Sequence, residues 1–301
     1  MNTHQRNSLI DAGLRVADSG MVDEDDIWSH YSNDKVDIGE RLAKVIRTIL
    51  ISEPLTKKLR ALSIGSSSEP QFRILETAFR GGLYLMDIDQ SALDRVEERI
   101  RRQYTDHVTT VRGNYLDILN HKGFIKKLLS DKLNNRRIDL ITLHHSLYYC
   151  TEELWLPLFE ALHKNILSSR GALHAVLMAD KSTDITTTTW LYNHFAGKFF
   201  GVRNNQSLPV LKMELEQSSV FRDSQILMTT SSVKFFVDDF EKMMKVIWMI
   251  LLYPNVHSYT ESQKLEIICY VIDNFWVKRL PLIQKQHHLA VYRGVDFPGI
   301  L

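Results

Sequence analysis

The chain has 301 residues and a mass of 35.0 kDa, with 37 Lys and Arg against 36 Asp and Glu, so its formal net charge is +1. This length is enough for one large domain or two small ones, and the 44% hydrophobic and 24% charged residues are typical of a globular protein with a full core. The balanced charge argues against a partner held mainly by electrostatics, such as bulk nucleic acid or an anionic membrane.

The two cysteines, Cys150 and Cys269, are far apart and neither belongs to a C-x-x-C pair. We therefore expect neither a disulfide framework nor a cysteine zinc site, and we expect each cysteine to be a small buried hydrophobic residue. No His, Asp or Glu residues stand at metal-ligand spacing, so no metal is predicted.

No targeting or membrane-spanning segment is predicted. The amino-terminal residues are polar and lack the apolar region of a secretory signal. The longest apolar run, Val246 to Tyr253, is much shorter than the roughly 20 residues that cross a membrane. We expect a cytoplasmic protein without a membrane partner.

Two helices are predicted at the start of the chain, over residues 1–20 and 37–51. In the second, apolar residues recur every four positions and form one face: Ile38, Leu42, Ile46 and Leu50. An acidic and aromatic segment, Asp23 to Tyr31, separates the two helices. We assign residues 1–50 to an amino-terminal helical cap and residues 51–301 to the main domain.

Strands and helices then alternate along the chain. Five short apolar segments are predicted to be strands: Leu59–Ile64, Leu83–Met86, Val108–Val111, Ile138–Leu143 and Ala172–Met178. The helices predicted between them are Gln71–Phe79, Ser91–Tyr104, Phe124–Leu133 and Glu152–Leu167. This alternation predicts an α/β fold, a doubly wound parallel sheet with helices on both faces.

The last third of the chain has a different pattern. We expect two helical insertions, over about residues 181–230 and 240–276, and the second contains helices at Phe240–Tyr253 and Glu261–Phe275. Strands are expected at Ser232–Val237 and Leu289–Tyr292. The pair His287–His288, at the start of the final strand, is predicted to lie on the surface.

Ligands of a parallel sheet bind at the carboxyl ends of its strands. Gly65, followed by three serines, permits a tight turn and a close approach of a ligand to the backbone. Asp87 stands 87 − 65 = 22 residues further on, the spacing at which a carboxylate meets a ribose diol. Asn114 and Tyr115 follow the third strand. Together these loops predict a nucleotide-like ligand.

Four segments carry a resemblance to the class I S-adenosylmethionine-dependent methyltransferases. LRALSIGSSSEPQFRILE, LYLMDIDQSAL, VRGNYLDIL and IDLITLHHSLYYC resemble that family's successive motifs, over roughly residues 55–180. LSIG, LYY at 147–149 and the helical 240–276 stretch are most similar to the small-molecule enzymes of the histamine N-methyltransferase type. The resemblance implies a Rossmann-like, mostly parallel sheet of seven strands with a helical cap and a carboxyl-terminal helical insertion.

The first loop departs from the family pattern. The family usually has G-x-G-x-G there, whereas Ser67 and Glu69 replace the second and third glycines. Ser63 stands where the family often has an acid. Glu69 either faces the cationic amino group of the cofactor or caps the next helix.

The resemblance implies S-adenosyl-L-methionine as cofactor, with S-adenosyl-L-homocysteine as product, and assigns its contacts. Asp87 would bind the ribose hydroxyls and Ile88 would pack on the adenine, which Asn114 and Tyr115 would flank. The residues expected at the methionine end are Gly65, Ser66, Ser67, Glu69, His144 and His145.

Structural alternatives stay open at most of these positions. Asp87 could cap the following helix, although Asp89 is better placed, and Asn114 could be a turn residue. His144 and His145 are either strand-end histidines bonded to the backbone or bases near neutral pH for the methyl acceptor. Residues that serve either as packing or as site walls, with Tyr148 also a candidate catalyst, are Trp28, Tyr31, Tyr148 and Tyr149.

The predicted reaction is direct displacement of the methyl group by a nitrogen or oxygen nucleophile of a small molecule. A protein or RNA methyltransferase is the first alternative, although no basic stripe indicates nucleic acid. A non-catalytic binding or regulatory protein is the second. A nicotinamide-dependent oxidoreductase is the third alternative, but this sequence lacks the G-x-G-x-x-G loop of that class. The sequence does not indicate an oligomeric state.

Overall fold

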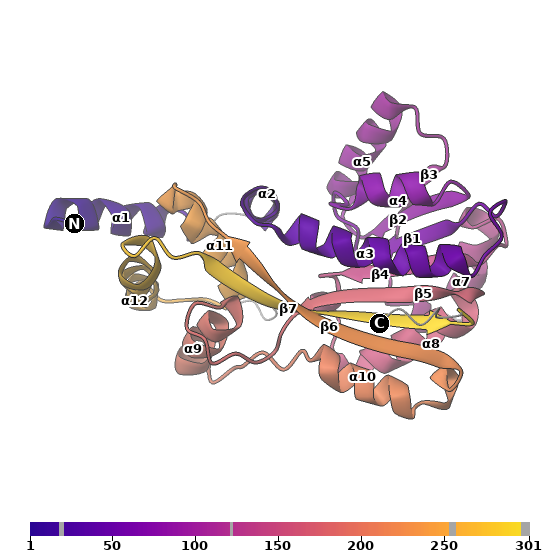
Figure 1. Ribbon diagram of the computed structural model, residues 1–301. Coiled ribbons are helices and arrows are strands. Elements are labelled where there is room, and N and C mark those ends of the chain that lie inside the picture. Colours follow the sequence, from indigo (N-terminus) through magenta and orange to yellow (C-terminus); the bar gives the residue numbers. More distant parts are fainter. Residues whose placement is uncertain (18–20, 121–122, 253–256, 296–301) are drawn as a thin grey trace. The chain divides into compact units, whose positions relative to one another are not determined.

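The computed structural model describes residues 1–17, 21–120, 123–252 and 257–295 (Figure 1). Its contacts divide the chain into two compact units, which we describe separately. Unit 1 comprises Met1–Asp37, Met178–Gln206 and Ser231–Gln286, and unit 2 comprises Ile38–Leu177, Ser207–Thr230 and His287–Leu301. The boundary predicted at residue 50 stays a prediction, because these units are defined by contacts and not by independent folding.

Seven strands form a single sheet in the order β3-β2-β1-β4-β5-β7-β6 (Figure 1). The pairings β3–β2, β2–β1, β1–β4 and β4–β5 are all parallel. This mixed, mostly parallel sheet confirms the predicted fold class. Its strand order reverses between β1 and β4, which is where such sheets bind ligands. The strands are β1 Arg60–Ile64, β2 Gly82–Asp87, β3 Val108–Arg112, β4 Ile138–His144, β5 Leu167–Met178, β6 Ser224–Phe235 and β7 Leu282–Arg293.

Helices cover both faces of the sheet in unit 2. Because alternate residues of a strand point to opposite sides, each strand contributes to both cores. On one side Ala61 and Leu140 pack with helices α3 and α4. On the other side Leu62 and Ile141 pack with α8 and α10. The helices with residues in this unit are α3 Asp34–Ile51, α4 Phe72–Ala78, α5 Gln90–Gln103, α6 Asp117–Asn120, α7 Phe124–Lys127, α8 Trp155–Ala161 and α10 Leu208–Gln217.

Helix α5 shows how local sequence sets an element's ends. The Asp89 side chain accepts a hydrogen bond from Ser91 N at 2.8 Å and so caps the amino end. Tyr104 ends the helix with φ +52°, in the left-handed region. The buried face between these ends consists of Ala92, Leu93 and Val96.

Unit 1 has its own apolar core. Trp248 and Phe195 are each 1% exposed, and the Trp248 indole donates to Gly13 O at 3.2 Å. Helix α2 was not predicted, because acidic residues mask its pattern. The helices with residues in this unit are α1 Thr3–Arg15, α2 Met21–Tyr31, α9 Thr188–Phe200, α11 Phe240–Leu252 and α12 Glu261–Val271, with α11 and α12 between β6 and β7.

Strand β7 begins seven residues before its predicted start, at Leu282 instead of Leu289. The reason is that Gln284, Gln286 and His288 alternate with exposed or half-buried residues, so polar side chains occupy the buried face. His288 is 3% exposed. The prediction that the pair His287–His288 lies on the surface is therefore wrong for His288, which strand periodicity turns inward.

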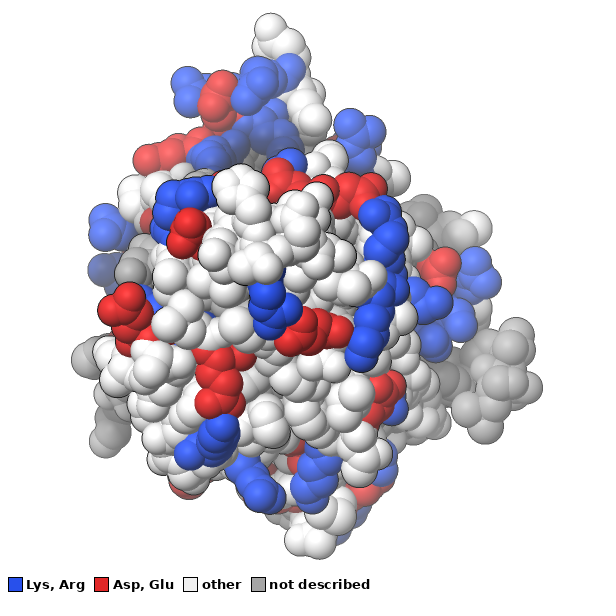
Figure 2. Space-filling model, turned by 90° about the vertical axis from the view of Figure 1, so that its left-hand side faces the viewer, with Lys and Arg blue, Asp and Glu red and all other residues white. Residues whose placement is uncertain are grey.

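Charges of both signs are interspersed on the face shown in Figure 2. Unit 1 also contains ion pairs, such as Arg6–Asp273 at 2.5 Å. Among the described residues, none of the helices combines the length and the apolar composition that crossing a bilayer requires.

Leu140 lies in the central strand β4 and is fully buried, so we expect Leu140→Ala to lower the free energy of unfolding by about 2–5 kcal/mol. The matched control is Leu55→Ala, since Leu55 is fully exposed and its loss leaves no cavity. Urea-induced unfolding followed by circular dichroism measures both. Equal effects of the two substitutions would contradict the assignment of Leu140 to the core.

Candidate functional site

The loops that follow β1, β2 and β3 are bonded to one another at the carboxyl end of the sheet. Gly65 N and Ser66 N both donate to Met86 O, at 2.9 and 3.1 Å. Gly113 N donates to Asp87 O at 2.9 Å. The three loops therefore form one connected surface next to the reversal of strand order.

The loop after β1 has the backbone of a glycine-rich turn with only one glycine. Gly65, Ser67 and Glu69 have φ values of +65°, +45° and +50°. These are the three positions at which the family pattern has glycine. A non-glycine residue in this region costs roughly 1–2 kcal/mol, so the rest of the structure imposes the conformation. A Cβ at Gly65 would lie 2.4 Å from Ser146 Cβ, which leaves only glycine there.

Glu69 is turned back toward the end of β1 and is 3% exposed. Its Oε2 accepts from Ser63 Oγ at 2.5 Å, and its Oε1 accepts from Gln71 N at 3.0 Å. Burial raises the pKa of this carboxyl group above its usual range. Glu69 thus brings a carboxyl group beside Ser63, the position at which the family often has an acid, and it also bonds the residue that precedes α4.

Asp87 fastens two loops together. Its Oδ2 accepts from Ser67 N at 2.7 Å, and its Oδ1 accepts from Asp89 N at 2.9 Å. Asp89 caps α5, so Asp87 is not needed for that task. The half-buried Asp87 carboxylate retains lone pairs for a diol, since each oxygen can accept more than one hydrogen bond. Its predicted ribose contact stays a prediction.

The loop after β3 is fixed by two side chains. Asn114 Oδ1 accepts from Leu116 N at 2.9 Å, which is the turn contact that the sequence left open. Tyr115 is 9% exposed and donates from its hydroxyl to Ser146 O at 3.0 Å. Burial raises the pKa of Tyr115. Ile88, the first residue after β2, is 66% exposed. The adenine contacts of these residues stay predictions.

The loop after β4 carries the predicted histidines and tyrosines. His145 has φ +53°, and its N–H donates to Val176 O at 2.9 Å. Its Nδ1 lies 3.5 Å from the Tyr148 hydroxyl, and the two rings are stacked at 6.0 Å. Tyr149 is exposed. The structure therefore brings His145 and Tyr148 together and turns Tyr149 to solvent.

Ser146 is a site residue that the sequence analysis missed. It is 3% exposed, and neither its hydroxyl nor that of Ser66, which is 4% exposed, has a hydrogen-bond partner among the described residues. Buried hydroxyls are almost always bonded, so each of these two has room to bond a water molecule or a polar atom of a ligand. In the sequence, the only signal for Ser146 was its position directly after the strand-end histidines His144 and His145.

His144 belongs to a cluster of three imidazoles in unit 2. Its Nε2 lies 2.9 Å from Nδ1 of His174, whose ring is stacked on that of His288 at 5.9 Å. Burial, and then the neighbouring imidazoles, lower the pKa of His144 well below its usual value and that of His174 to about 3. Within the part of the chain that the structure describes, no group of His, Cys, Asp or Glu is arranged to hold a metal ion.

Two of the predicted pocket residues lie in unit 1. Trp28 is 6% exposed and is stacked on Phe235 at 5.6 Å. The Tyr31 hydroxyl accepts from Lys242 Nζ at 3.0 Å. These contacts are those of packed residues, and the role of Trp28 and Tyr31 in a substrate pocket stays a prediction.

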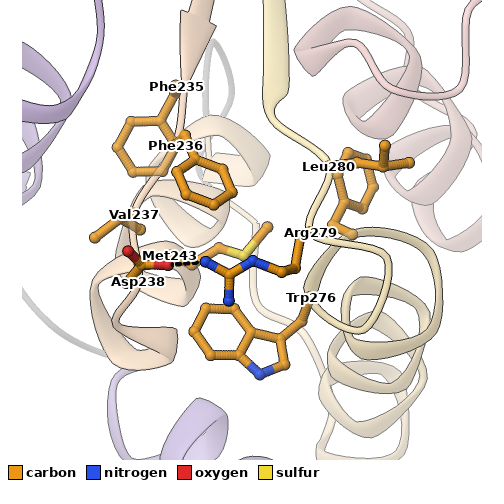
Figure 3. A pocket seen from close by; sticks show the side chains of 9 residues that line it. Phe235, Phe236, Val237, Asp238, Met243, Trp276, Arg279 and Leu280 are labelled. Atoms are coloured by element: carbon orange, nitrogen blue, oxygen red, sulfur yellow. Dashed lines mark hydrogen bonds and ion pairs between the residues drawn. The ribbon is translucent and has the colours of Figure 1, made fainter.

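Unit 1 also contains a cavity of about 100 Å³ with mostly apolar walls (Figure 3). The Arg279 guanidinium lies 5.6 Å from the Phe236 ring and donates to Asp238 at 2.6 Å. None of the site residues predicted from the sequence lines this cavity. Its lining is Phe235, Phe236, Val237, Asp238, Met243, Phe275, Trp276, Arg279 and Leu280.

The left-handed conformation of Ser67 predicts a stabilising substitution. Ser67→Gly removes the steric cost of φ +45° and should raise the free energy of unfolding by about 1 kcal/mol. The control is Ser68→Gly, next in the chain and outside the left-handed region, which should be neutral or destabilising by up to about 1 kcal/mol. Urea unfolding compares them, and a destabilised Ser67→Gly variant would contradict the loop geometry.

The depressed pKa of His174 predicts loss of stability in acid. Below pH 6.5 the unfolded chain binds a proton at this histidine, whereas the folded chain does so only near pH 3. The free energy of unfolding should therefore fall with pH across that window, by about 1.4 kcal/mol per pH unit from His174. His174→Asn should show a shallower decline in unfolding titrations at stepped pH. If the free energy of unfolding fell equally steeply with pH in the wild type and in His174→Asn, the assignment of His174 as a neutral buried imidazole would be wrong.

No family model matches the chain, and no curated protein matches its sequence. Among solved structures, the YcgJ protein from Bacillus subtilis superposes with a TM-score of 0.50 and 10% identity, over 84% of this chain and 100% of that chain. A candidate sarcosine dimethylglycine methyltransferase from Galdieria sulphuraria gives a TM-score of 0.49 with 15% identity, over 86% of each chain. Magnesium protoporphyrin IX methyltransferase from Synechocystis, solved with bound SAH, gives 0.47 with 12% identity, over 86% and 84%. The chain therefore has a Rossmann-like fold, a mostly parallel sheet of seven strands with helices on both faces, and shares this fold with the YcgJ protein.

Proposed function

We propose that this protein is an S-adenosylmethionine-dependent methyltransferase that acts on a nitrogen or oxygen atom of a small molecule. The observation that carries the proposal is a pair of buried hydroxyls that have no partner among the described residues: Ser66, in the left-handed loop after β1, and Ser146, in the loop after β4. Both loops lie at the reversal of strand order, the position at which the fold binds ligands.

The residues around these two loops fit the cofactor. Ser66 Oγ and Ser146 Oγ would bond polar atoms of the methionine portion, which would satisfy both buried hydroxyls. Asp87, already held by Ser67 N, would bind the ribose hydroxyls. The cofactor would supply an electrophilic methyl group on a sulfonium. The chain's own task would then be to align the methyl acceptor, exclude water and take up one proton.

His144 and the His145–Tyr148 pair are the proposed groups for the acceptor. A neutral imidazole can accept a proton, and the lowered pKa keeps His144 neutral at pH 7. The same shift makes His144 a weaker base than the expected histidine with a pKa near neutral pH. The aromatic ring of Tyr148 would attract a cationic amine or sulfonium. Together with the LYY segment, these residues support a small amine, of the class used by histamine N-methyltransferase-like enzymes, as the first acceptor to test.

A non-catalytic protein with this fold is the second candidate. Its support is the replacement of two loop glycines by Ser67 and Glu69, which puts side chains where the family has none. It would bind the cofactor without turnover on any acceptor. A protein or RNA acceptor would be indicated by turnover on macromolecules alone.

The first test is calorimetric titration with S-adenosylmethionine and with S-adenosylhomocysteine. We expect wild-type protein to bind both, and Asp87→Ala to lose at least about 2 kcal/mol of binding free energy, roughly 30-fold in Kd, because hydrogen bonds to a carboxylate are lost. Asp89→Ala is the matched control, since Asp89 caps α5 and should leave Kd within about threefold.

A folded wild-type chain that binds neither compound would reject the proposed function. Where binding is found, radioactive methyl transfer to panels of small amines, phenols, peptides and RNA separates the candidates. Turnover on a small amine or phenol supports the proposal, and binding without turnover on any panel supports the non-catalytic protein.

A further inference from the structure

One face of the sheet changes from apolar to polar along its strands. Near the amino ends, Ala61, Leu140 and Ala172 are fully buried against the core that contains α3 and α4. Two residues further along the same strands stand Ser63, Thr142 and His174, which are also buried. Ser63 pairs with Thr142, and Thr142 pairs with His174, so a buried polar row crosses β1, β4 and β5.

His174 is the end of this row and contacts the candidate site through His144. It is 1% exposed, and its Nδ1 lies 2.9 Å from His144 Nε2, with the two rings at 84°. The titratable groups that influence the pair are His145 from the β4 loop and His288 from β7.

A contact between two neutral imidazoles requires one of them to donate. Both rings are neutral at pH 7, because burial lowers the pKa of each. If His144 Nε2 donates, then His144 Nδ1 keeps its lone pair and can accept a proton. If His174 Nδ1 donates instead, then His144 Nδ1 carries a hydrogen and cannot act as a base.

We propose that His174 is a positioning residue that accepts a hydrogen bond from His144 Nε2 and so leaves His144 Nδ1 as the proton acceptor for the methylation reaction. The inference rests on the proposed function, since a base is needed only where the methyl acceptor must lose a proton. The His288 ring is stacked on His174 with centroids 5.9 Å apart, and the contact to His144 Nε2 defines where Nδ1 of His174 lies.

The tautomer is measured directly on the full chain by long-range proton–nitrogen correlation of 15N-labelled histidines. His144 is assigned from the signals lost in His144→Ala. We expect Nδ1 of His144 to have a pyridine-type shift in the wild-type protein and an averaged shift, from both tautomers, in His174→Ala. His174→Asn places an amide oxygen near the lost Nδ1 and should restore the wild-type tautomer in part.

The matched control is His163→Ala. His163 is also buried, at 4% exposed, and its Nε2 bonds Ser224 Oγ at 3.0 Å and not the cluster. This substitution should leave the His144 signals unchanged. A pyrrole-type Nδ1 in wild-type His144, or His144 signals that are the same in wild type and His174→Ala, would overturn the proposal.

Kinetics separate this inference from the proposed function. With an accepted substrate, His174→Ala should lower kcat at least tenfold, change the pH profile of kcat and leave the KM for S-adenosylmethionine within about twofold. A variant with the wild-type pH profile would overturn the positioning role. Expected tautomer signals without cofactor binding would instead reject the proposed function and leave the assignment of the hydrogen bond intact.

Discussion

The Asp87 carboxylate organises the candidate site. Its two oxygens accept from Ser67 N and Asp89 N, so the end of β2 holds both the loop after β1 and the start of α5. This bond, together with those from Gly65 N and Ser66 N to Met86 O, holds Ser67 in a left-handed conformation that L-residues avoid. The same group is the proposed ribose ligand, and the residue that would bind the cofactor is therefore also the one that shapes the loop around it.

A second constraint acts beneath the loops. The close approach of Gly65 to Ser146 and the bond from Tyr115 to Ser146 O bring the ends of β1, β3 and β4 to one point. Polar residues then replace apolar ones on the inner face of the sheet, as the step from Leu140 to Thr142 shows. The part of the sheet beneath the candidate site is thus polar as well, and burial keeps the imidazoles of His144 and His174 neutral there.

The sequence predicted the sheet well because buried parallel strands are short apolar runs, such as Ile138–Leu143. It failed at β7, where Gln284 and Gln286 occupy a buried face that apolar patterning cannot reveal. The strand-end residues Gly65, Asp87 and Asn114 were found because chain order places them at one edge. Ser146 and the contact between His144 and His174 were not, since they depend on side-chain packing between distant strands. The sequence also could not indicate that Glu69 turns back to Ser63.

The left-handed serine and glutamate of the first loop have a consequence for how such loops vary. Their backbone is held by hydrogen bonds from neighbouring strands, so its shape does not require glycine at every turn. A polar residue at positions 67 and 69 is thus compatible with this loop, at a cost of roughly 1–2 kcal/mol each. A search by glycine pattern alone would therefore miss this chain, whereas the loop geometry and the carboxylate that anchors it remain recognisable in the structure.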